Sequence, residues 1–296
     1  MRVTTLLPVL ALAVAVSAGG CDRTPNAAAL QQACDRGNAD ACFNLGDMYR
    51  TGEEVTQDLT RAASLFQQAC GGGSAAGCRR LGEMYRSGEG VTEDSTRAVS
   101  LFQHACDGRD AAACFMLGYA YAHGEAVTQD YVRAAALYEN ACGNGDARGC
   151  RNLGAMYATG LFGVTQDVTR AVWLYQQACD GGDAEGCCYI GIMYRNGIGV
   201  SEDTTRARTL LRQACAANIA ECCFNLAGMY ADGYGVTRDR SLAASLLEQA
   251  CGGGYAPGCY NLGAMYQKGD GVPRDLGRAE SLMQKACDLG YALACR

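Results

Sequence analysis

A short motif related to Leu-Gly-x-Met-Tyr recurs along this chain at an almost constant spacing. Successive copies begin 36 residues apart, except for one step of 37 residues between the fourth and the fifth. A fixed period of this length indicates a repeat array, in which each small unit buries its apolar side chains against its neighbours. The 296 residues are therefore not expected to form one or two ordinary globular cores. The seven copies are Leu45–Tyr49, Leu81–Tyr85, Leu117–Tyr121, Leu153–Tyr157, Ile190–Tyr194, Leu226–Tyr230 and Leu262–Tyr266.

Each repeat is predicted to consist of two helices joined by a turn that contains glycine. In the first copy, residues 39–50 and 59–70 both place apolar side chains at helical spacing. Gly46 stands in the middle of the first of these helices, where glycine costs about 1 kcal/mol relative to alanine, and this indicates a close approach by a neighbouring helix. An aspartate directly before each second helix can accept hydrogen bonds from the unpaired amides of the first turn. These aspartates are Asp58, Asp94, Asp130, Asp167, Asp203, Asp239 and Asp275.

The cysteines follow the same period. The chain has 19 of them, far more than a reducing cytosol usually tolerates, and this points to an oxidising compartment. Most fall in pairs eight residues apart, in which one cysteine ends a second helix and the other begins the next first helix. No histidine accompanies the pairs to complete a set of four ligands, so neither a metal site nor a cofactor is predicted. The expected disulfides join Cys34 with Cys42, Cys70 with Cys78, Cys106 with Cys114, Cys142 with Cys150, Cys179 with Cys187, Cys215 with Cys223, Cys251 with Cys259 and Cys287 with Cys295.

Three cysteines remain outside these pairs: Cys21, Cys188 and Cys222. Cys188 and Cys222 lie in the predicted first helices of adjacent repeats. Cys222 occupies a column that small residues fill elsewhere, as expected where neighbouring helices touch. Two interpretations stay open, namely a ninth disulfide between the fifth and sixth repeats or two free buried thiols.

The first 20 residues have the layout of an export signal. Met1 and Arg2 give a positive start, residues 6–16 are apolar apart from one proline, and a run of small residues ends at Cys21. The apolar stretch is too short for a stable membrane span. We expect this segment to be removed during export.

The cleavage site decides whether the protein is anchored. The run Ala18–Cys21 resembles a bacterial lipobox, in which the cysteine is lipidated and becomes the new N-terminus. The alternative is ordinary cleavage after Ala18, which leaves a soluble protein. The expected organisation is a short tether over residues 21–25 and a single solenoid over residues 26–296. We expect the protein in the bacterial cell envelope, facing the periplasm or secreted, with the lipid on Cys21 as its membrane contact.

The units also share a second pattern. After the motif comes Gly-x-Gly-Val, then aspartate, then a basic residue before alanine, as in Gly88–Ala98 (GEGVTEDSTRA). Helix pairs with this pattern resemble Sel-one-like repeats (SLR), relatives of the tetratricopeptide repeat, over Asn26–Arg296. The cysteine pair in each copy is similar to the Helicobacter cysteine-rich proteins of that family, which are secreted and disulfide-bridged. The resemblance implies an all-α fold, a right-handed α-solenoid of seven repeats with half-repeat caps, one disulfide per repeat and first helices along a concave face. The sixth repeat departs from the pattern, with Leu242 at the basic position.

The resemblance also implies a scaffold that binds a protein or peptide partner on the concave face. Aromatic side chains there could bury apolar groups of the partner, and Arg79 or Arg151 could pair with a carboxylate. The alternative for each of these residues is that it packs against its neighbours in the chain. The candidate partner-binding residues are Phe43, Arg79, Phe115, Tyr119, Arg151, Phe224 and Tyr260.

Two other functional classes fit less well. The net charge of -6 lacks the basic excess that nucleic-acid binding needs, so no nucleic-acid partner is expected. Cysteine-rich relatives are often labelled β-lactamases or penicillin-binding proteins, so a hydrolase is the alternative function. Neither Lys268 nor Lys285 follows a serine by three residues, so the Ser-x-x-Lys pair of those enzymes is missing. His104 and His123 are interpreted as surface substitutions, and no catalytic residue is predicted.

Overall fold

A computed structural model describes residues 26–160 and 163–295. This part contains fifteen α-helices and one short 3-10 helix, and no strand is present in it. The predicted export signal, Cys21 and the predicted tether lie outside the described residues. The first helices of the seven repeats are α2 (Ala39–Thr51), α4 (Ala75–Ser87), α6 (Ala111–His123), α8 (Ala147–Thr159), α10 (Ala184–Asn196), α12 (Ala220–Asp232) and α14 (Ala256–Lys268). The second helices are α3 (Leu59–Gly71), α5 (Ser95–Asp107), α7 (Tyr131–Gly143), α9 (Val168–Asp180), α11 (Thr204–Ala216), α13 (Arg240–Gly252) and α15 (Leu276–Asp288). Helix α1 (Ala27–Asp35) precedes the first repeat, and the 3-10 helix η1 (Ala292–Ala294) follows the last.

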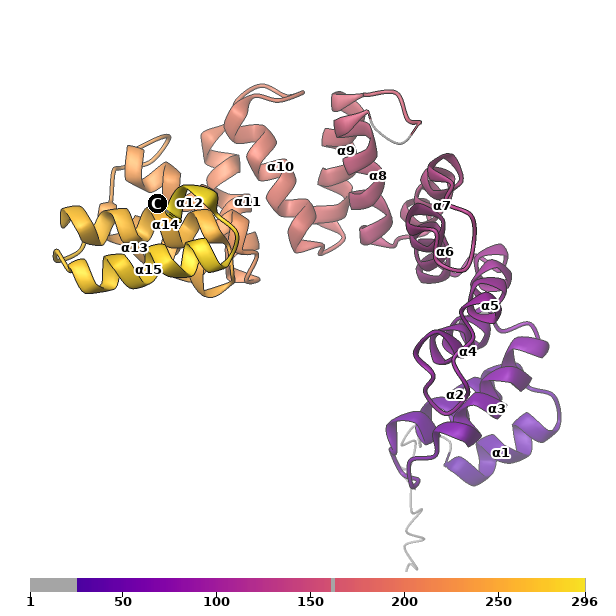
Figure 1. Cartoon of the computed structure of the whole chain (residues 1–296). Coiled ribbons are helices and arrows are strands. Elements are labelled where there is room, and N and C mark those ends of the chain that lie inside the picture. The colour runs from indigo at the N-terminus through magenta and orange to yellow at the C-terminus, as the bar shows by residue number, and fades with distance from the viewer. Residues whose placement is uncertain (1–25, 161–162, 296) are drawn as a thin grey trace, which may run out of the picture.

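The helices form an open, curved stack with α1 at one end and α15 at the other (Figure 1). Each helix packs against the next one in the chain. First helices of consecutive repeats also touch, for example α8 with α10 and α12 with α14. The layer of first helices is therefore the more closely spaced one and forms the inner side of the curve. The predicted α-solenoid is confirmed. No helix in the described ranges has the length and apolar character needed to cross a bilayer.

The predicted helix caps are confirmed. Asp58 Oδ1 accepts a hydrogen bond from the Arg61 backbone amide at 2.9 Å. The aspartates before the six remaining second helices all make an equivalent bond. The first helices end at a glycine in the left-handed conformation, such as Gly52 with φ 80°. Glycine adopts this conformation without the steric cost that other residues have. The turn sequence therefore sets where each helix ends.

The mid-helix glycine makes the expected close contact between the two helices of a repeat. A Cβ added at Gly46 would lie 2.8 Å from Cε1 of Phe66 in α3. The sixth repeat is different, because Ala227 occupies the glycine position and the facing residue of α13 is Leu247. Both side chains are buried in the same cluster. Leucine at the facing position is not confined to this repeat, because Leu211 faces Gly191 in the fifth repeat.

The basic residue of the repeat pattern lies over the tyrosine of the motif. The guanidinium carbon of Arg61 is 4.4 Å from the ring centroid of Tyr49, a cation–π contact between the first and second helices. Leu242 replaces this arginine in the sixth repeat, so Tyr230 receives no guanidinium from that position. The equivalent pairs are Arg97 with Tyr85, Arg133 with Tyr121, Arg170 with Tyr157, Arg206 with Tyr194 and Arg278 with Tyr266.

Within residues 26–160 and 163–295, nine disulfides hold neighbouring helices together. Eight join the cysteines that are eight residues apart, with Cα atoms 4.4 to 4.9 Å from each other. Closing so short a loop stabilises the folded state by about 2.5 kcal/mol in the chain-entropy view. The ninth joins Cys188 to Cys222, whose Cα atoms are 5.7 Å apart and whose side chains are both buried. Disulfides in this number form and persist in an oxidising compartment outside the cytosol.

Candidate functional site

All candidate binding residues except Tyr119 lie along the inner side of the curve in one row, which we call the inner column. This row is the fifth residue of each first helix, and its side chains are half-buried except for the buried Cys188. In several repeats the inner-column residue contacts the residue that caps the next first helix. The inner column is therefore also a contact between repeats. Its members are Phe43, Arg79, Phe115, Arg151, Cys188, Phe224 and Tyr260.

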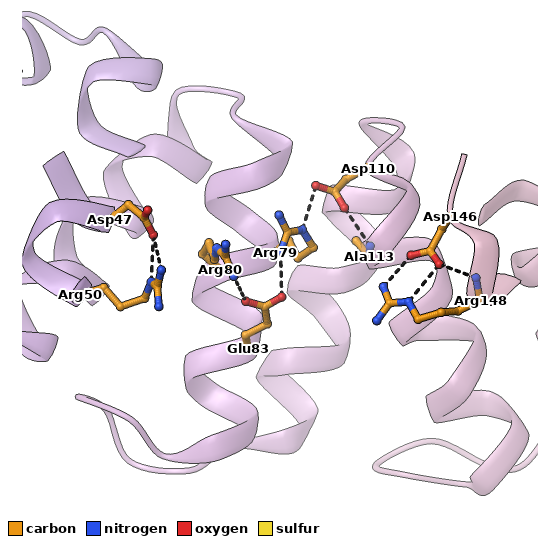
Figure 2. Close-up of polar contacts among 9 residues, drawn as sticks. All are labelled: Asp47, Arg50, Arg79, Arg80, Glu83, Asp110, Ala113, Asp146 and Arg148. Carbon is orange, nitrogen blue, oxygen red and sulfur yellow. Dashed lines mark hydrogen bonds and ion pairs between the residues drawn. The ribbon is translucent and has the colours of Figure 1, made fainter. Parts of the chain in front are cut away.

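Arg79 lies at the centre of an ion-pair network on this face (Figure 2). Its Nε donates to Asp110 Oδ2 at 3.0 Å, and its NH1 group donates to Glu83 Oε1 at 2.8 Å. Arg80 binds the other oxygen of Glu83 at 2.9 Å. Asp110 also caps α6, because its Oδ1 accepts a hydrogen bond from the Ala113 amide at 2.8 Å. One carboxylate thus joins the cap of one repeat to the arginine of the repeat before it.

Electrostatics keeps this arginine charged. Burial by itself lowers the pKa of Arg79, but the hydrogen bond and charge of Asp110, together with Glu83, more than offset it and raise the pKa above its ordinary value. The guanidinium is therefore fixed in place and permanently positive.

Arg151 repeats the arrangement two units later. Its Nε lies 3.6 Å from Asp183 Oδ2, and its NH1 group also pairs with Glu185. Asp183 caps α10 by accepting a hydrogen bond from the Gly186 amide at 2.6 Å. Carboxylates of this chain thus already bind both guanidinium groups, and the pairing of Arg79 or Arg151 with a partner's carboxylate stays a prediction.

Aromatic pairs replace the ion pairs in the last repeats. The ring centroids of Phe224 and Tyr255 are 5.2 Å apart, and those of Tyr260 and Tyr291 are also 5.2 Å apart. Tyr255 and Tyr291 occupy the cap position that Asp110 holds in an earlier repeat, and neither makes a side-chain cap. Burial raises the pKa of Tyr255, with a smaller contribution from Glu221.

The inner column and the next cap position match in part of the chain. Arg79 and Arg151 accompany aspartate at the next cap, and Phe224 and Tyr260 accompany tyrosine there. Phe43 and Phe115 do not follow this pattern, because Ser74 and Asp146 stand at their cap positions. The sequence analysis considered only the aspartates that cap second helices and so missed Asp110, Asp183, Tyr255 and Tyr291 as partners of the inner column. Comparing residues 31 or 32 positions apart would have revealed the pairing.

The remaining predicted residues, Phe43, Phe115 and Tyr119, belong to neither the arginine–aspartate pairs nor the aromatic–tyrosine pairs. Phe43 packs on Phe66 with ring centroids 5.8 Å apart. Arg148 lies over Phe115, with the guanidinium carbon 4.3 Å from the ring centroid. Tyr119, one turn further along α6, stacks on His123 with centroids 3.8 Å apart.

Other pairs complete the charge balance of this face (Figure 2). Asp146 accepts a hydrogen bond from Arg148 NH2 at 2.6 Å, and this bond raises the pKa of Arg148 above its ordinary value. Arg50 pairs with Asp47 at 2.7 Å on a more exposed part of α2. The positive and negative groups along the inner side of the N-terminal repeats thus largely neutralise each other locally.

Two cavities lie between consecutive second helices, at equivalent places in their repeats. One, of about 500 Å³, is lined by residues that include Tyr194 and Arg206; the other, of about 380 Å³, includes Tyr266 and Arg278. In both, the arginine donates a hydrogen bond to the tyrosine hydroxyl. The cavities arise at equivalent positions of the repeat, and no residue of the inner column lines them.

Comparisons with known proteins agree with the repeat architecture. The profile of the Sel1 repeat family matches seven segments, residues 39–74, 75–110, 111–146, 147–183, 184–219, 220–255 and 256–291. A search of curated proteins found no match to the chain.

Similar solved structures include a protective antigen present in uropathogenic Escherichia coli strains that displays an SLR fold. It is 30% identical, the alignment covers 90% of this chain and 57% of the antigen, and the TM-score is 0.80. The chain thus spans little more than half the length of that protein. A Sel1 repeat protein from Oxalobacter formigenes is 27% identical over 77% of this chain and 99% of that one, with a TM-score of 0.67. Helicobacter pylori cysteine rich protein B is 29% identical over 44% of this chain and 93% of its own, with a TM-score of 0.37. The seven matched segments span residues 39–291, and the chain belongs to the Sel1 repeat family.

Proposed function

We propose that this chain is a scaffold of the bacterial cell envelope that holds an extended protein or peptide partner along its inner face. Repeat solenoids present long concave surfaces of this kind, and Sel1 repeats generally mediate contacts between proteins. Which partner binds is determined by the side chains of the inner face rather than by the fold.

The observation that supports this proposal is the fixed, charge-balanced character of the inner face. Arg79, Arg80 and Glu83 hold one another in place, and Asp110 ties them to the next repeat. Side chains that are already ordered lose little conformational entropy when a partner binds. Because their charges cancel locally, net charge does not select the partner. The half-buried aromatic residues are left as the groups that gain most from contact.

Tyr119 is the clearest aromatic anchor among them. Its ring stacks only on the exposed His123 among the ring contacts of the described residues, whereas Phe43 and Phe115 also lie against the aromatic residues Phe66 and Tyr138. Aromatic anchors commonly provide most of the binding energy of an interface. We assign Phe43, Phe115, Phe224 and Tyr260 to the same apolar contact surface for the partner. Arg79 and Arg151 are assigned to the walls of this surface, where they hold its shape.

The test compares two aromatic substitutions on opposite sides of the solenoid. Tyr119→Ala removes the proposed anchor, and Trp173→Ala removes a 58% exposed ring from α9, a second helix. With the tethered protein and envelope extract, we expect Tyr119→Ala to lower retention of a specific partner at least about tenfold. Trp173→Ala should leave it unchanged. The reverse result would place the binding surface on the outer side.

The envelope location is tested separately. We propose that residues 1–20 are an export signal, that Cys21 carries lipid and that residues 21–25 tether the solenoid. Wild-type protein should then fractionate with membranes, whereas Cys21→Ser should be released. Equal release of both forms would support ordinary cleavage after Ala18 instead.

A further inference from the structure

In several repeats a side chain of the second helix lies beside the disulfide that joins the first helix of that repeat to the helix before it. It is the tenth residue of the helix, which we call the disulfide-facing position. Gln68 Oε1 lies 3.4 Å from Cys34 Sγ, and Gln249 Oε1 lies 3.4 Å from Cys215 Sγ. The residues at this position are Gln68, His104, Asn140, Gln177, Gln213, Gln249 and Lys285.

His104 is the one imidazole in this series. Its Nδ1 lies 3.4 Å from Cys78 Sγ, and the donor atoms of His104, Cys78 and Cys70 all lie within 4.8 Å of one another. The two sulfurs are joined in a disulfide and so are not available as metal ligands in this state. The cluster is a disulfide with a proton-carrying group beside one sulfur. A neutral amide such as Gln68 cannot supply a proton in this way, whereas imidazole readily does.

Access to the disulfide is one-sided. Exchange with a thiol requires the attacking sulfur to reach one of the two cysteines. Cys78 is 1% exposed, whereas Cys70 is partly exposed. Attack therefore occurs at Cys70, and the departing sulfur is that of Cys78, beside His104. Both cysteines are buried in six other bridges, namely Cys34–Cys42, Cys106–Cys114, Cys179–Cys187, Cys188–Cys222, Cys215–Cys223 and Cys251–Cys259.

We infer that the Cys70–Cys78 bridge is a site of exchange with small-molecule thiols, at which His104 donates a proton to the departing sulfur. The attacking thiolate forms a bond to Cys70 Sγ as the Cys70–Cys78 bond breaks. The electron pair of that bond passes to Cys78 Sγ, which takes up a proton from Nδ1 of the imidazolium form of His104, and the ring is left as neutral imidazole. The incoming thiol is oxidised to the mixed disulfide on Cys70, and Cys78 is reduced to a thiol. A better stabilised leaving group makes the exchange faster.

Another bridge of the chain provides a matched control. Cys142 is partly exposed and Cys150 is buried, as in the Cys70–Cys78 pair, and the loop between the cysteines has the same length. Gln177 occupies the disulfide-facing position for this bridge. The two sites therefore differ chiefly in the residue at this helix position.

The experiment measures mixed-disulfide formation at each site in the full-length protein. The protein is treated with reduced glutathione, quenched with acid, alkylated and mapped by peptide mass spectrometry. Cys70 should form the mixed disulfide about tenfold faster than Cys142. His104→Gln should lower the Cys70 rate to that of Cys142, and Gln177→His should raise the Cys142 rate.

His104→Gln and Gln177→His change exposed residues, and glutamine and histidine both already occur at the disulfide-facing position. Circular dichroism verifies that each variant is folded. A merely structural role for His104 does not predict the gain at Cys142 from Gln177→His. Equal rates at the two sites in the wild type, or a Cys70 rate unchanged by His104→Gln, would overturn the inference.

Discussion

Gly82 of α4 lies so close to Phe102 of α5 that a Cβ added at Gly82 would stand 2.7 Å from Phe102 Cε1. Cβ atoms essentially never come this near to another heavy atom. In the sixth repeat the same two positions hold Ala227 and Leu247, and both are buried. The chain thus contains one repeat in which alanine is accommodated at the glycine position, opposite leucine.

The first prediction exchanges one arrangement for the other. Gly82→Ala should lower the free energy of unfolding by about 2 kcal/mol, because the ring of Phe102 must move within a packed interface. The double variant Gly82→Ala with Phe102→Leu should recover part of this loss. The measurement is urea denaturation followed by circular dichroism. A neutral effect of Gly82→Ala alone would contradict the close approach.

The repeat period, the caps and the cysteine pairs could be predicted because local rules determine them. Asp58 caps its own helix, and Cys34 and Cys42 are separated by a single short connection. Helical spacing and capping chemistry act within a few residues, so the sequence alone shows them. The contact of Gly46 with the next helix follows for a similar reason.

The contacts of the inner column could not be predicted in the same way. Whether Arg79 meets Asp110 depends on the rotation between consecutive repeats, which is set by packing over the whole interface. His104 shows the same limit. It is exposed, as expected of a surface substitution, but its contact with Cys78, 26 residues earlier on the first helix of the same repeat, depends on how the two helices pack and was missed.

A second prediction separates the two roles of Asp110. Asp110→Asn keeps an acceptor for the Ala113 amide but loses the charge that faces Arg79, and should cost about 1 kcal/mol. Asp110→Ala loses both and should cost about 2 kcal/mol. The free energies of unfolding are compared with those of the same changes in an Arg79→Met background. Identical costs in both backgrounds would show that Arg79 and Asp110 are not coupled.

A third prediction concerns the bond between adjacent repeats. If Cys188 and Cys222 are joined, neither should react with iodoacetamide in denatured, unreduced protein, and a peptide pair linked through them should appear by mass spectrometry. Both should become reactive after reduction. The Cys188→Ala and Cys222→Ala double variant should melt at a lower temperature, because the cross-link no longer restricts the unfolded chain. Alkylation of both cysteines before reduction would show two free thiols instead.

The last prediction uses the buried tyrosine of α9. Burial raises the pKa of Tyr175 well above its ordinary value, so the folded protein holds this side chain neutral. The unfolded chain ionises it at about pH 10, and from there the free energy of unfolding should fall as the pH rises toward the higher folded-state pKa. Below about pH 10 the stabilisation that comes from keeping Tyr175 neutral is fully present, because the residue is neutral in both the folded and the unfolded chain. Tyr175→Phe, which has no hydroxyl to ionise, should lose less stability between about pH 8 and about pH 11. The measurement is urea denaturation at both pH values after free thiols are blocked with iodoacetamide, and an equal loss in both proteins would show that Tyr175 ionises as freely in the folded state as in the unfolded chain.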